Sequence, residues 1–276
     1  ASDVYKRQIV SGENIINMIF LFWRYFMFVD THCHLSNEDY KNIEEVLKEN
    51  RQAGVSSIII SGCTKESISE SLEYAKKYSD VFVTIGYHPS EADIIIDSDL
   101  SFLEEQLCLD KVVGLGEIGL DYHYGKENRE KQISLFEKQL AIAEKHHLPV
   151  VIHSRDATFD TIDCLRKYSV IGVIHCFSGS LETAKEYIKM GFFLGIGGVI
   201  TFKNSNLADT VTKIPLDSIV LETDSPYLTP VPYRGEKNSS KYIPFIAEKI
   251  ANCKNVSLKQ VAEITTSNAK YIFHLD

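Results

Sequence analysis

Six side chains of types that commonly bind metal ions stand where apolar runs of the sequence end. They are His32, His34, Glu117, His153, His175 and Asp224. In His32-Cys33-His34, the two-residue period of a strand puts both imidazoles on one face and Cys33 on the other, so both rings can reach one ion. Four histidines and two carboxylates are about the ligand set that a hydrolytic site with two divalent cations needs. Zinc, manganese, cobalt and, less well, magnesium suit such ligands.

The two carboxylates of this set are predicted to be catalytic. Glu117 ends the apolar run 112–116, and a carboxylate buried at that position needs a cation beside it. Its two oxygens can bridge two ions. Asp224 follows the apolar run 219–221 and precedes a Ser-Pro turn. We expect Asp224 to bind metal and also to orient or deprotonate the attacking water.

Three further residues are candidate contacts for an anionic substrate. Arg155 follows the fifth apolar run, Arg234 lies on a loop near the C-terminus, and His88 ends the third run. A guanidinium group matches the geometry of a phosphate. Other roles remain open for each residue: an ion pair with Asp156 or a neighbouring loop for Arg155, a solvated loop position for Arg234, and stabilisation of a turn for His88.

The composition of the 276-residue chain limits its class. A formal net charge of -9 argues against a protein that coats long nucleic acids by bulk electrostatics. The same net charge is compatible with a small metal-binding cavity at one end of the barrel. The six cysteines form no C-x-x-C pair, which argues against a disulfide framework or a zinc knuckle and suits a reducing cytoplasm. With 44% hydrophobic residues, the chain can bury one large core.

Eight short β-branched runs alternate with segments whose apolar residues have helical spacing. The expected strands are 28–31, 55–60, 81–85, 112–116, 149–152, 172–174, 192–197 and 218–221, and two helices follow at 241–251 and 257–271. Eight such units without a linker predict an α/β fold, a (β/α)8 TIM barrel with a single domain over 27–276. An open doubly wound sheet is the alternative, but that fold gathers its ligand at one switch point. The six candidate ligands stand at the ends of five expected strands, and a closed ring brings these ends together more readily than an open sheet.

The first 26 residues need a separate interpretation. The apolar segment 18–29 is interrupted by Arg24 and is too short to span a membrane. Met27 immediately precedes the first strand, so we expect residues 1–26 to lie outside the native fold. A genuine amphipathic or membrane-touching extension is the alternative. For residues 27–276 we expect no membrane association and a cytoplasmic location.

Five motifs occur in a fixed order between Met27 and the C-terminus. They are Asp30–His34, Gly116–Tyr122, His153–Ala157, His175–Gly179 and Glu222–Leu228, the last accompanied by Tyr233-Arg234-Gly235. This set resembles the TatD-type metal-dependent deoxyribonucleases, a branch of the amidohydrolase-like barrels. The resemblance implies hydrolysis of DNA phosphodiesters, often from an end, with DNA ends or single strands as substrate and no stable protein partner. It implies one ion at His32, His34, Glu117 and Asp224, and a second at Glu117, His153 and His175.

Two other functions remain open from the sequence. A barrel with two metal ions could hydrolyse a small cyclic amide, lactone or ester, because such a site serves acyl and phosphoryl transfer alike. Many of those barrels bridge their metals with a carboxylated lysine, whereas Glu117 occupies the fourth-strand position here. A metal-occupied barrel that acts mainly as a binding or regulatory partner is the other alternative. The complete ligand set favours an enzyme.

Overall fold

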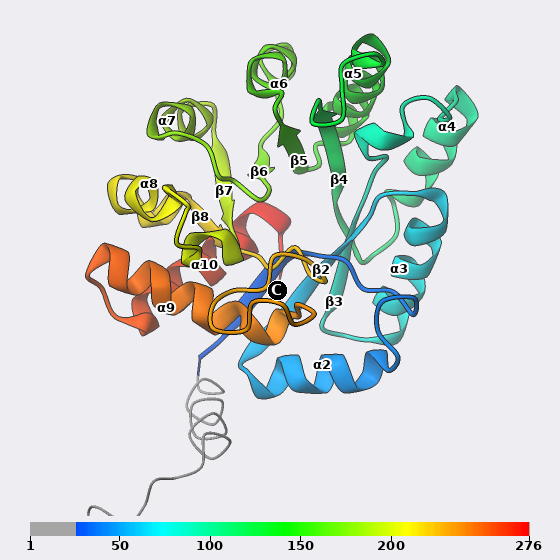
Figure 1. Cartoon of the computed structure of the whole chain (residues 1–276). Coiled ribbons are helices and arrows are strands. Elements are labelled where there is room, and N and C mark those ends of the chain that lie inside the picture. The colour runs from blue at the N-terminus through cyan, green and yellow to red at the C-terminus, as the bar shows by residue number, and fades with distance from the viewer. Residues whose placement is uncertain (1–25, 276) are drawn as a thin grey trace, which may run out of the picture.

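Eight parallel strands form one sheet whose order follows the chain from β1 to β8 (Figure 1). The computed structural model describes residues 26–275. The strands are β1 Phe28–Cys33, β2 Val55–Gly62, β3 Val81–Ile85, β4 Val112–Asp121, β5 Val150–Arg155, β6 Gly172–Ile174, β7 Phe192–Ile196 and β8 Ile219–Leu221. The predicted (β/α)8 barrel is confirmed. The prediction for residues 1–26 stays a prediction, because residues 1–25 lie outside the described part of the chain.

Helices connect the strands and surround the sheet (Figure 1). They are α2 Ile43–Gln52, α3 Lys65–Lys77, α4 Asp97–Gln106, α5 Arg129–His146, α6 Thr158–Leu165, α7 Leu181–Lys189, α8 Leu207–Lys213, α9 Ile243–Lys254 and α10 Leu258–Phe273, with short 3-10 turns η1 Pro89–Glu91, η2 Gly198–Thr201, η3 Leu216–Ser218 and η4 Ser240–Tyr242. Ser257 and Gln260 cap each other's backbone N–H groups at the start of α10. Within residues 26–275, no helix combines the length and apolar character that crossing a bilayer requires.

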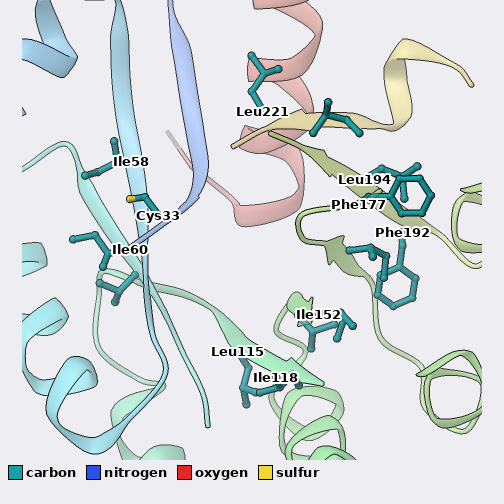
Figure 2. Packing of buried hydrophobic residues seen from close by; sticks show 14 of the residues in the cluster. Cys33, Ile58, Ile60, Leu115, Ile118, Ile152, Phe177, Phe192, Leu194 and Leu221 are labelled. Atoms are coloured by element: carbon teal, nitrogen blue, oxygen red, sulfur yellow. The ribbon is translucent and has the colours of Figure 1, made fainter. Parts of the chain in front are cut away.

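The two faces of the sheet bury different apolar clusters. The outward face packs against the helices in a large cluster, part of which Figure 2 shows around Ile58, Ile152 and Leu194. Cys33 belongs to this outer cluster, as the strand period predicts. A separate cluster joins one valine or isoleucine from each of five strands to the end of α10: Val29, Ile59, Val151, Val173 and Val220 with Ala269, Ile272, Phe273 and Leu275. These residues fill the barrel interior, so the site must lie above them at the strand ends.

The first and last strands meet at a seam that polar side chains join. Asp30 of β1 is fully buried and accepts hydrogen bonds from the backbone N–H of Thr223 at 3.0 Å and from its hydroxyl at 2.6 Å. The Thr31 hydroxyl donates to the carbonyl oxygen of Leu221 at 2.9 Å. These contacts connect residues about 190 positions apart in the chain. The seam therefore forms only when the whole barrel has closed.

The seam predicts a pH dependence of stability. Burial raises the pKa of the Asp30 carboxyl to about 7, even though hydrogen bonds, foremost from Thr223, lower it. The folded state therefore keeps the proton over a range in which the unfolded carboxyl has lost it, and this contribution to stability disappears as the pH rises through 7. Asp30→Asn cannot ionise. We expect the free energy of unfolding of the wild type, relative to Asp30→Asn, to fall by about 2 kcal/mol between pH 5 and 8.

Urea unfolding of both metal-free proteins at several pH values measures this difference. Parallel pH profiles for wild type and Asp30→Asn would show that Asp30 does not titrate in this range.

Candidate metal centre

Glu117 lies inside a strand rather than at its end. The expected strand 112–116 is too short: β4 continues to Asp121, because its ladder with β5 extends to the pair Asp121 and Arg155. Residues 117–121, which the expected strand leaves out, are therefore still part of the sheet. This correction matters for the site, because the strand projects Glu117 and Asp121 toward the same end of the barrel from one rigid element.

Each carboxylate oxygen of Glu117 lies near a different pair of imidazoles. Oε2 lies 3.3 Å from Nε2 of His32 and 3.8 Å from Nε2 of His34. Oε1 lies 2.6 Å from Nδ1 of His153 and 3.0 Å from Nε2 of His175. Glu117 itself is only 4% exposed. A buried carboxylate with one oxygen toward each pair has the arrangement of a bridging ligand.

Asp224 completes the pair formed by His32 and His34. Its Oδ1 lies 3.7 Å from Nε2 of His32 and 3.6 Å from Nε2 of His34. The backbone at the barrel seam holds it there. The N–H of Asp224 donates to the carbonyl oxygen of His32 at 3.0 Å, and the N–H of His34 donates to that of Ser225 at 2.7 Å. The backbone contacts that close the barrel therefore also position Asp224.

The donor set fits divalent cations. Ligand atoms lie within 4.8 Å of one another in four sets: His32, His34 and Glu117; His32, His175 and Asp224; Glu117, His153 and His175; and His88, Asp121 and His153. Burial opposes ionisation of Glu117, yet the nearby His175 and His32 hold its pKa well below the usual value, so it is a carboxylate. Burial lowers the pKa of His32, which favours the neutral imidazole that binds metal. All six predicted ligands are brought together.

Two carboxylates that sequence reasoning missed lie behind the histidines. Oδ2 of Asp121 is 3.1 Å from Nε2 of His153, on the side of the ring away from Glu117. Oε1 of the fully buried Glu222 is 3.5 Å from Nδ1 of His175. A carboxylate hydrogen-bonded to a ligating imidazole fixes its tautomer and orientation, which is the arrangement of Asp121 and His153. Glu222 lies close to His175, and its Oε1 accepts a hydrogen bond from the N–H of Cys176 at 2.5 Å. A signal was available for Glu222, since it stands two residues before Asp224 and so repeats the spacing of the two first-strand histidines.

The ligands open onto a cavity of ≈ 700 Å³. His88 lines this cavity, as predicted. Its Nδ1 accepts a hydrogen bond from the N–H of Ser90 at 3.1 Å, and burial lowers its pKa to about 4. The ring is therefore neutral near pH 7 and carries its proton on Nε2. His88 therefore stabilises the turn through Nδ1, and its Nε2–H is a hydrogen-bond donor near the candidate ligands.

The two predicted arginine contacts lie in different places. Arg155 lines the cavity, with its guanidinium 5.6 Å from the ring centroid of Tyr124. Asp156, its alternative partner, is paired with His123 instead, at 3.1 Å. Arg234 does not line the cavity. Its guanidinium lies over the ring of Phe202 at 4.0 Å and donates to a backbone carbonyl, because its loop packs against η2 and the segment after it.

Comparisons with known proteins agree with this geometry. The sequence model described as TatD related DNase matches residues 29–274. The chain belongs to the TatD family. It is 40% identical to the metal-dependent hydrolase YabD of Bacillus subtilis over 91% of this chain and all of that protein. It is 35% identical to the metal-dependent hydrolase YcfH of Escherichia coli, over 90% and 96% of the two chains.

A solved structure of another TatD family protein has the same fold. The crystal structure of the TatD homologue YjjV from Escherichia coli superposes with a TM-score of 0.85 at 30% identity, and the match covers 92% of this chain and 99% of that one. This TatD family chain is therefore a metal-dependent hydrolase, and its six clustered His and carboxylate residues are the candidate ligands.

The position of Asp121 behind His153 predicts that removing its carboxylate weakens metal binding selectively at one ion site. Asp121→Ala removes the group that orients His153. We expect a divalent ion at Glu117, His153 and His175 to bind roughly 10- to 100-fold more weakly, with little change at His32, His34 and Asp224. Competition with a chromophoric chelator measures both affinities. Asp93→Ala is the matched control, since Asp93 is an exposed acid paired with Lys131. Equal metal affinities for Asp121→Ala and the control would contradict this role.

Proposed function

We propose that this TatD family hydrolase cleaves phosphodiester bonds of DNA, acting on ends or single strands with two divalent cations bound. The division of the Glu117 oxygens between two imidazole pairs carries the proposal, because it offers one set of ligands to each ion. The family description as DNase supports the substrate class. The scattered, unpaired cysteines support a cytoplasmic location.

Bound divalent cations would lower the pKa of a water molecule and offset the charge that develops on phosphate oxygens. The chain's own carboxylates divide the remaining work. Asp224 is largely buried, and its neighbours, foremost His34, outweigh the effect of burial and keep its pKa below the usual value. It is therefore ionised at neutral pH. An ionised oxygen beside the ligand cluster can orient the attacking water and accept its proton.

Two side chains of the cavity wall suit the phosphate itself. Arg155 supplies a guanidinium that no carboxylate pairs with in the described part of the chain. His88 presents a neutral N–H donor from the end of β3, beside His153 at 4.6 Å between ring centroids. Together they would hold the non-bridging oxygens while the carboxylates act on the water.

The direct test is hydrolysis of end-labelled single-stranded DNA with magnesium, manganese, cobalt or zinc. We expect the wild type to shorten the strand with at least one of these ions. Glu117→Gln keeps the side chain's size but removes the charge that two imidazole pairs share, so activity should fall by at least about 100-fold. Glu127→Gln, a change at an exposed acid of the β4–α5 loop, should stay active. A wild type that hydrolyses lactones or esters but no DNA would contradict the proposal and favour the acyl-transfer alternative.

The different positions of the two arginines predict different kinetic effects. Arg155→Ala should raise KM for DNA several-fold with a smaller change in kcat, because a charge-assisted contact to the phosphate contributes to binding in both ground and transition states. Arg234→Ala should have less effect, since its guanidinium is engaged by Phe202 and Thr229. Steady-state kinetics of both variants test this order. A larger rise in KM for Arg234→Ala would show that its loop reaches the substrate.

A further inference from the structure

Two exposed tyrosines stand on opposite sides of the metal cavity. Tyr124 follows β4 and is 88% exposed, and Tyr227 follows β8 and is 62% exposed. Both line the cavity that contains the metal ligands. In a ring of eight strands, β4 and β8 are half a turn apart, so the two rings face the cavity from opposite directions.

The chain holds both rings near the metal ligands. The N–H of Tyr227 donates to the carbonyl oxygen of Asp224 at 2.9 Å, and its own carbonyl accepts from the amide of the buried Asn238 at 2.5 Å. Tyr124 lies next to Arg155, whose guanidinium is 5.6 Å from the ring centroid. Each exposed ring is thus connected to a residue of the candidate site, one through the backbone and one through a cation–π contact.

The charges around the cavity make aromatic contacts important for a polyanionic substrate. Of the residues that line it, Arg155 is the one Lys or Arg, whereas Glu117, Asp121 and Asp224 are acidic. The whole chain carries a net charge of -9. Few phosphates can therefore be neutralised by side chains, and binding through many ionic contacts is not available to this surface. Beyond what Arg155 and bound cations would contribute, contacts to the bases are an available source of affinity.

Building on the proposed function, we infer that Tyr124 and Tyr227 are stacking platforms for the bases on either side of the scissile phosphate. Base–aromatic stacking tolerates any base, because every base has a π face. It requires those bases to be unstacked from their neighbours, which single strands and frayed ends allow and an intact duplex does not. The two rings thereby select single-stranded nucleic acid.

The test compares oligonucleotides with and without bases. One is a fluorescein-labelled thymidylate oligomer with non-hydrolysable phosphorothioate linkages, and the other is an abasic oligomer of the same length and backbone. Fluorescence anisotropy of the metal-loaded protein gives Kd for each. We expect Tyr124→Ala and Tyr227→Ala each to weaken binding of the thymidylate oligomer by roughly 5- to 100-fold. Binding of the abasic oligomer should stay within about twofold, because the removed ring has no base to contact.

Two kinds of control separate stacking from other effects. Tyr124→Phe and Tyr227→Phe keep the rings and should bind like the wild type. Phe159→Ala removes an aromatic ring that is 87% exposed on α6 but does not line the cavity, and it should also bind like the wild type. Tyr124 and Phe159 are more than four-fifths exposed, and Tyr227 is 62% exposed. The substitutions should therefore leave the fold intact, and circular dichroism checks this.

The outcomes distinguish this inference from the proposed function. If the wild type cleaves DNA but the Tyr→Ala variants bind both oligomers as the wild type does, stacking is overturned and the nuclease proposal stands. Equal losses on the thymidylate and abasic oligomers also overturn stacking. If the wild type neither binds nor cleaves any oligonucleotide, the proposed function fails, and the stacking inference fails with it.

Discussion

The structure depends on one buried carboxylate surrounded by imidazoles. Glu117 is almost fully removed from solvent, and each of its oxygens faces two histidines. Burying an unpaired charge is strongly unfavourable, so this group has to be balanced by positive charge. The four histidines come from or directly follow β1, β5 and β6, while Glu117 comes from β4. Only a sheet curved into a ring brings these strands to one point, where bound cations would balance the charge of Glu117 directly.

The barrel seam links the fold to the site. Asp30 and Thr223 join β1 to the end of β8, and the next residue, Asp224, binds the backbone of His32. The residues that close the ring are therefore neighbours in sequence of those that complete one ligand set. The second set has a different kind of support, since Asp121 and Glu222 lie behind its two histidines. One half of the site is positioned by backbone contacts at the seam, and the other half lies against two carboxylates, the half-buried Asp121 and the buried Glu222.

The fold and the clustering of the six candidate ligands could be predicted from sequence, because both depend on local patterns. Apolar runs mark strands, parallel strands have their C-terminal ends at one rim, and ligand-type residues at those ends must converge. Asp121 lies beyond the expected strand 112–116 because the length of β4 depends on its pairing with β5, which is a non-local contact. Glu222 was missed because its role depends on which way a buried side chain turns. Arg234 is a predicted substrate contact that does not line the cavity, because its guanidinium packs over Phe202, more than 30 residues earlier in the chain.

Glu117 is expected to bridge two ion sites. A crystal structure of the manganese-loaded protein, with data collected to record the anomalous scattering of manganese, tests it most directly. We expect two anomalous peaks about 3.5–4 Å apart, one on each side of Glu117. His32, His34 and Asp224 should surround the first peak, and His153 and His175 the second. A single peak, or peaks that Glu117 does not contact, would contradict it.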